Sequence, residues 1–176
     1  MIVAKQVADL ITSTRVLIAL CLVGVGFIQG GAGLSLVAWL VVLDWAGDMV
    51  DGRIARRSRV QYHTWIGDHD LEVDMTVSIG LLVYLLSAGY VNIWMAGGYI
   101  LLWCFYFWQK GGILHSFGML FQAPIYGWFI WIALRDAPGT GWAIVVFLLT
   151  VLAVTWPYFP KVMVAGFFAG FRKDGS

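Results

Sequence analysis

The sequence predicts an all-α integral membrane protein with six transmembrane helices and an N-terminal amphipathic surface helix. Three observations predict this fold class. Of the 176 residues, 61% are hydrophobic and only 12% are charged, whereas a soluble domain usually carries about a quarter charged residues. The apolar residues form runs long enough to cross a bilayer, and the charged residues gather between those runs. We therefore interpret residues 1–176 as a single membrane domain.

The elements follow in order along the chain. Residues 1–13 mix polar Lys5, Gln6 and Asp9 with apolar side chains, which is typical of a short helix lying on the membrane surface. No small-residue cleavage site follows Arg15, so a cleaved signal peptide is not expected. A span needs roughly 20 apolar residues. The predicted six-helix core covers residues 14–160, and residues 161–176 form a cytoplasmic tail. The predicted spans are 16–29, 34–50, 75–90, 93–108, 117–133 and 142–159. The first of these is short, so we expect it to include residues from 11 onward.

The distribution of basic residues gives the predicted orientation. With a cytoplasmic N-terminus and alternating helices, only Arg135 of the 11 Lys and Arg residues falls outside, which is a strong positive-inside bias. Both termini are therefore predicted to be cytoplasmic in a multi-pass cell-membrane protein. Five tryptophans lie near predicted helix ends, as in an aromatic belt: Trp65, Trp94, Trp108, Trp142 and Trp156. The net charge of +1 gives no case for nucleic acid.

Acidic residues are concentrated around the second and third predicted spans. Seven of the ten are Asp44, Asp48, Asp51, Asp68, Asp70, Glu72 and Asp74. Carboxylates at a membrane edge are costly unless they are paired, hydrated or bound to metal, so the cluster is a candidate functional site. Asp48 and Asp51 are three residues apart and Asp70 and Asp74 four, so each pair shares a helix face. Four convergent carboxylates suit Mg²⁺ or Mn²⁺, with two ions expected.

Neighbouring residues fit a phosphate-bearing substrate. Gly52 allows a ligand to approach the backbone, and Arg56, one helical turn further, offers a planar fork of donors to phosphate. Two interpretations stay open for Asp44, which either contacts a ligand or faces a polar pocket between helices. Arg57 and Arg59 either bind a phosphorylated acceptor or only keep their loop on the cytoplasmic side of the membrane through their positive charge. Asp68 and Glu72 are best interpreted as solvated loop residues.

These residues resemble the signature of the CDP-alcohol phosphotransferase family. The segment from Asp48 to Arg56 reads Asp-Met-Val-Asp-Gly-Arg-Ile-Ala-Arg and matches every fixed position of DxxDGxxAR. Gly67 and the pair Asp70 and Asp74 resemble the second half of the signature, which reads GxxxDxxxD. The size, the six helices and Thr12-x-x-Arg15, near the start of the first span, are also similar to that family.

The second half departs from the family pattern. Ten residues rather than eight separate Arg56 from Gly67, and two rather than three separate Gly67 from Asp70. An ungapped alignment puts His69 and Val73 at the last two aspartate positions, and valine can neither bind a metal nor accept a proton. We prefer a one-residue insertion in the loop, because loops absorb insertions at small cost.

The resemblance implies an enzyme that transfers a phosphatidyl-type group from a CDP-alcohol, with CDP-diacylglycerol the expected donor, to an acceptor hydroxyl and releases CMP. It implies that Asp48, Asp51, Asp70 and Asp74 hold the metal ions on the cytoplasmic side and that Asp74 is also the general base. It implies that the nucleotide meets Gly52, Ala55, Arg56 and Gly67. Homodimers are usual in this family, so a homodimer is expected.

Two other functions are weighed against this one. A divalent-cation transporter or channel would use the same carboxylates, but the third to sixth predicted spans contain no acidic residue. A catalytically inactive relative would explain the extra residue before Asp70. Release of CMP from labelled CDP-diacylglycerol separates the enzyme from both alternatives.

Overall fold

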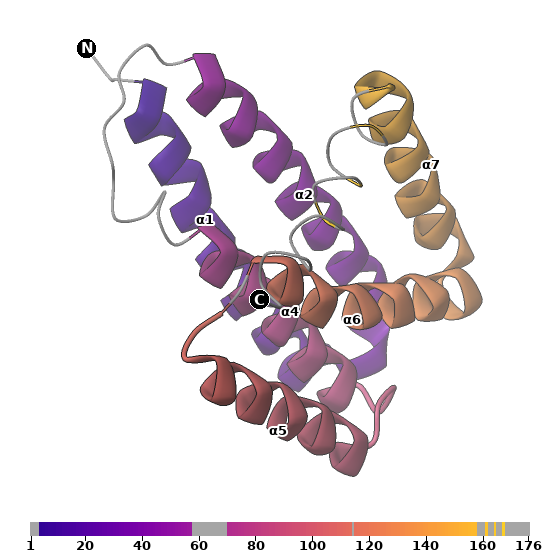
Figure 1. Ribbon diagram of the computed structural model, residues 1–176. Coiled ribbons are helices and arrows are strands. Elements are labelled where there is room, and N and C mark those ends of the chain that lie inside the picture. Colours follow the sequence, from indigo (N-terminus) through magenta and orange to yellow (C-terminus); the bar gives the residue numbers. More distant parts are fainter. Residues whose placement is uncertain are drawn as a thin grey trace. The chain divides into compact units, whose positions relative to one another are not determined.

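The computed structural model describes residues 4–57, 70–113 and 115–157, together with residues 161, 164 and 167. Within these ranges, side chains are described from Thr14 to Val50 and from Leu71 onward. The described chain is helical and contains no strand, which confirms the all-α class for these residues. Figure 1 shows its elements, α1 (Ala4–Gln29), η1 (Gly30–Gly33), α2 (Leu34–Arg57), α4 (Asp70–Ser87), α5 (Ile93–Lys110), α6 (His115–Asp136) and α7 (Pro138–Thr155). They form two compact units, Met1–Tyr90 and Val91–Ser176.

In the first unit, α1 packs against both α2 and α4 (Figure 1). The four-residue η1 turn joins the end of α1 to the start of α2, and Asp44 and Asp48 of α2 reach back to Arg15 in the first half of α1, so the two helices are antiparallel (Figure 1). The contacts of α1 with α4 run in the same residue order on both helices, because Arg15 meets Asp74, Ala19 meets Gly80 and Gly26 meets Ser87. The two helices are therefore parallel. The N-terminal halves of α1 and α4 consequently lie at the same end of the unit as the C-terminal half of α2.

The first unit is apolar on the inside and also on much of the outside. Its most deeply buried aliphatic residues are Leu22, Val37, Val41, Val77, Leu81 and Leu85. On the outside, Leu20, Ile28 and Leu43 are 64%, 84% and 59% exposed. Soluble proteins rarely expose large apolar patches. Helices that are apolar on both faces match a lipid surrounding.

Three helical stretches are long and apolar enough to cross a membrane by length and composition: Thr14–Val50, which η1 interrupts, His115–Asp136 and Pro138–Thr155. Helix α4 does not qualify, and its first five residues include the three acidic side chains Asp70, Glu72 and Asp74. Helix α5 does not qualify either, and it contains several tryptophans and tyrosines and ends in Gln109 and Lys110. The protein thus has the apolar helices of a membrane protein.

Several helix limits differ from the predicted ones. Helix α1 runs without a break from Ala4, so a separate surface helix over residues 1–13 is not confirmed. No glycine or proline interrupts the chain before Gly24, so nothing ends the helix where the sequence turns from polar to apolar. Helix α2 continues past the apolar run to Arg57, and α4 begins at Asp70 rather than residue 75.

The second unit is formed by α5, α6 and α7. Helices α6 and α7 pack together, and Phe129 of α6 and Ile144 of α7 are fully buried. The buried ring of Phe121 on α6 contacts the rings of Tyr99 and Trp103 on α5. The hydroxyl of Tyr99 on α5 donates a hydrogen bond to the carbonyl of Phe121 on α6. Helix α5 ends where Gly111 adopts the left-handed conformation at φ 72°, which glycine reaches without steric cost.

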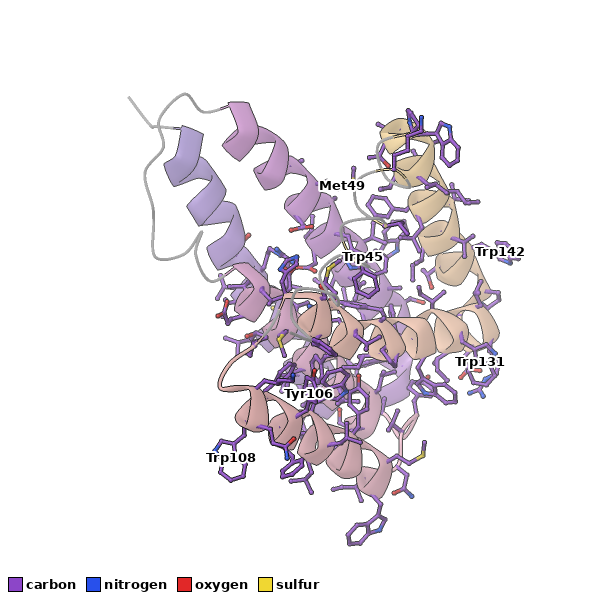
Figure 2. The ribbon with its side chains drawn as sticks, viewed as in Figure 1. Trp45, Met49, Tyr106, Trp108, Trp131 and Trp142 are labelled. Atoms are coloured by element: carbon purple, nitrogen blue, oxygen red, sulfur yellow. The ribbon has the colours of Figure 1, made fainter. Side chains whose placement is uncertain are left out.

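Tryptophans project outward near the helix ends of this unit. Figure 2 shows Trp108 near the end of α5 and Trp142 in the first turns of α7, and these side chains are largely exposed. Trp94 and Trp156 are exposed as well, near the start of α5 and directly after α7. Their positions are those predicted for an aromatic belt. Trp65 lies outside the described residues.

The close approach of α1 and α4 depends on Gly80. A Cβ atom at this position would lie 2.8 Å from the carbonyl oxygen of Ala19, so the helices must separate to admit it. We expect Gly80→Ala to lower the free energy of unfolding by about 1–3 kcal/mol, the usual cost of overpacking. Detergent-solubilised protein titrated with a denaturant and followed by tryptophan fluorescence measures this change.

Gly97→Ala is the matched control for that experiment. Gly97 lies inside α5, and a Cβ atom there meets no described atom within 4 Å. Alanine is a better helix former than glycine by about 1 kcal/mol. We therefore expect Gly97→Ala to leave stability unchanged or to raise it. Equal effects of the two substitutions would contradict the packing role of Gly80.

Candidate active site

Arg15 lies at the centre of the candidate site. It is in the first half of α1, the helix that packs against both α2 and α4, and its side chain is only 4% exposed. A guanidinium is costly to bury unless carboxylates surround it. The surrounding carboxylates come from α2 and α4.

Each of three nitrogens of Arg15 donates to a different aspartate. Nε lies 2.9 Å from Oδ1 of Asp44, and one terminal nitrogen lies 3.0 Å from Oδ1 of Asp48. The other terminal nitrogen donates to Oδ1 of Asp74. We call Arg15, Asp44, Asp48 and Asp74 the Arg15 cluster. Asp44 and Asp48 are one helical turn apart on α2, so both reach α1 from the same helix face.

Burial differs sharply among the three carboxylates. The side chain of Asp44 is fully buried, whereas those of Asp48 and Asp74 are 46% and 28% exposed. The Arg15–Asp44 pair therefore forms the closed side of the Arg15 cluster. Asp48 and Asp74 form its open side, where a ligand can reach them.

The Arg15 cluster combines three carboxylates with one guanidinium. Carboxylates gathered near apolar surface favour hydration, protonation or binding of a cation. Carboxylate oxygens are the donors that Mg²⁺ and Mn²⁺ prefer.

The structure brings two of the four predicted metal ligands, Asp48 and Asp74, to the same guanidinium. The other two, Asp51 and Asp70, lie at the C-terminal end of α2 and at the start of α4, and their side chains are outside the described set. No group of three or more His, Cys, Asp or Glu residues placed to hold an ion occurs among the side chains that are described.

The residues predicted to meet the nucleotide are described less fully. Gly52, Ala55 and Arg56 lie in the last two turns of α2, without described side-chain positions, and Gly67 lies outside the described residues. The same holds for the side chain of Arg57 and for all of Arg59. These assignments stay predictions.

Two residues of the site were not assigned their roles from the sequence. Asp44, for which two interpretations were open, lies in a buried polar contact with Arg15. Arg15 itself was counted as a cytoplasmic basic residue, yet it is buried and ion-paired. The available signal was the Thr12-x-x-Arg15 element, which placed an arginine at the start of the first span.

Comparison of the chain with protein-family models, curated proteins and solved structures returned no match.

Proposed function

We propose that this protein is a multi-pass membrane enzyme that transfers a phosphatidyl-type group from a CDP-alcohol to an acceptor hydroxyl and releases CMP. The observation that carries the proposal is the meeting of Asp48 from α2 and Asp74 from α4 at one guanidinium. These aspartates belong to the two halves of the motif that resembles the CDP-alcohol phosphotransferase signature. A site built from both halves requires such an approach.

The donor chemistry of the site fits one or two Mg²⁺ or Mn²⁺ ions. Asp48 and Asp74 supply hard oxygen donors on partly exposed side chains, and Asp51 and Asp70 would complete the set. When bound, a divalent ion would neutralise charge that develops on the diphosphate and on the departing CMP. The carboxylates would hold the ion at the end of the unit where α1 and α4 begin.

The chain's own residues supply the remaining chemistry. The acceptor hydroxyl is a weak nucleophile, and Asp74 would take its proton as the new oxygen–phosphorus bond forms at the lipid-linked phosphorus. The bond from that phosphorus to the oxygen of CMP then breaks, and CMP leaves with the electron pair. Arg56, one helical turn beyond Gly52 on α2, would pair with phosphate oxygens of the nucleotide.

The proposed orientation in the membrane has six spans and cytoplasmic termini. It is supported by the antiparallel α1–α2 pair and by the parallel run of α1 and α4, which is the order expected of three successive spans. It is also supported by the positive-inside distribution, in which only Arg135 lies outside. The active site would then face the cytoplasm, where the water-soluble CDP group is reached, beside a lipid substrate.

A transfer assay tests the proposal. Purified protein is mixed with radiolabelled CDP-diacylglycerol, Mn²⁺ or Mg²⁺, and a panel of alcohols that includes glycerol phosphate, inositol and serine. We expect metal-dependent CMP release with at least one acceptor, and complete loss of CMP release with EDTA, because the phosphoryl charge is then not neutralised.

The alternatives predict different results in the same preparation. A cation transporter reconstituted in vesicles would carry Mn²⁺ across the bilayer without releasing CMP. An inactive relative would bind CDP-diacylglycerol and leave it intact with every acceptor. Either result would remove the enzymatic proposal.

A further inference from the structure

We propose that Arg15 competes with the divalent cation for Asp48 and Asp74, so that the guanidinium acts as an internal counter-ion of the metal site. The inference rests on the proposed function, because it concerns the same carboxylates. It assigns to Arg15 a role that the signature of the family resemblance does not contain.

The geometry places Arg15 at the oxygens that the cation needs. Its two terminal nitrogens contact one oxygen each of Asp48 and Asp74. A guanidinium so close to a metal ligand repels a divalent cation on that ligand, because their charges are separated by only a few ångströms in a partly desolvated place. The cation can bind tightly only if the terminal nitrogens withdraw.

The anchor of Arg15 is on the closed side of the cluster. Nε pairs with Asp44, whose side chain is fully buried, while the terminal nitrogens face the more exposed Asp48 and Asp74. Because the guanidinium is rigid and planar, its terminal nitrogens can leave Asp48 and Asp74 only if the whole group tilts, with the contact between Nε and Asp44 as the pivot. A displaced fork is also placed to meet an anion such as a diphosphate, since guanidinium groups bind phosphate with paired donors.

A purely structural role for Arg15 predicts the opposite sign. If Arg15 only holds Asp48 and Asp74 in position, its removal scatters the ligands and weakens cation binding. If Arg15 competes, its removal strengthens cation binding. The direction of the change therefore decides between the two roles.

The test is Mn²⁺ affinity of the full chain in detergent, measured by electron paramagnetic resonance of the free ion at constant ionic strength. The variant is Arg15→Gln with Asp44→Asn, which removes one positive and one negative charge together, so the net charge of the Arg15 cluster stays the same. Because Arg15 touches Asp48 and Asp74 directly whereas Asp44 is a helical turn away from Asp48, the potential at the open side becomes more negative. We expect the Kd for Mn²⁺ to fall by about tenfold or more.

The matched control makes the same exchange in another ion pair. Arg135 pairs with Asp136 through Nε at 2.6 Å on an exposed part of α6, and Arg135→Gln with Asp136→Asn should leave Mn²⁺ affinity unchanged. Arg15→Lys is the second variant, since lysine keeps the charge but loses the fork, and we expect its affinity to lie near that of the unmodified protein.

The outcomes separate this inference from the proposed function. If the unmodified protein binds Mn²⁺ and the Arg15→Gln, Asp44→Asn variant binds it equally or more weakly, competition by Arg15 is wrong and the metal site stands. If neither binds Mn²⁺, both the inference and the metal-dependent function are wrong. Binding by the variant alone supports competition in its strongest form.

Discussion

Asp74→Asn is expected to lower the rate of CMP release by about 100- to 10,000-fold, the usual contribution of a general base. Asparagine keeps the size of the side chain and an oxygen that can accept the hydrogen bond from Arg15, but it cannot take a proton from the acceptor alcohol. Asp74 lies where α4 meets α1 and is 28% exposed, so a substrate hydroxyl can reach it. Single-turnover release of labelled CMP measures the effect.

Binding of the nucleotide is the second measurement for this variant. Asp48, Gly52 and Arg56 all lie on α2, so CDP should bind the Asp74→Asn protein with little change in affinity. Asp136→Asn is the control, because it makes the same chemical change in an ion pair with Arg135 on α6. We expect its CMP release to equal that of the unmodified protein. Full turnover by the Asp74→Asn protein would remove Asp74 from the role of base.

The helices of this protein were easier to predict than their limits. Each of the six predicted spans overlaps a described helix, but only three described stretches are long and apolar enough to cross a membrane, so six spans are not confirmed. Gly111 and Pro138 mark the end of α5 and the start of α7. The hydropathy pattern missed the last seven residues of α2, because a span prediction follows apolar character while the helix continues through polar residues to Arg57. Helix formation and membrane burial are separate properties, and the hydropathy pattern alone does not distinguish the end of one from the end of the other.

The site was predictable within each helix but not between helices. Residue spacing indicated that Asp70 and Asp74 share a face, because a helix fixes that relation locally. The contacts of Arg15 with Asp44, Asp48 and Asp74 join residues 29, 33 and 59 positions apart. Such contacts depend on the packing register, which the close approach of Gly80 to Ala19 helps to set. The spacing of residues along the chain does not predict that register.

Arg15→Met is expected to be the most destabilising single substitution in the first unit. It removes the guanidinium from the buried carboxylate of Asp44 and from its contacts with Asp48 and Asp74. Removing one partner of a buried ion pair usually costs about 3–5 kcal/mol, because the remaining charge stays desolvated. Denaturant titration in detergent, followed by tryptophan fluorescence, measures the free energy of unfolding.

Arg135→Met is the control, because its pair with Asp136 is exposed, with side chains 51% and 32% accessible. Exposed pairs contribute little to stability because water screens them, and Arg135 adds a contact with the ring of Trp131 at 4.8 Å from its centroid. We expect the loss of stability to be much smaller than that of Arg15→Met.

A double substitution identifies the source of the destabilisation. Arg15→Met with Asp44→Leu replaces the closed side of the Arg15 cluster by apolar side chains, and buried ion pairs can often be replaced in this way with little loss. Asp48 and Asp74 keep their charges but are partly exposed, so water can solvate them. The double variant should therefore recover most of the stability that Arg15→Met loses. If the two losses simply add, the cost does not come from leaving Asp44 charged and buried, and the Arg15–Asp44 pair is not what closes this side of the site.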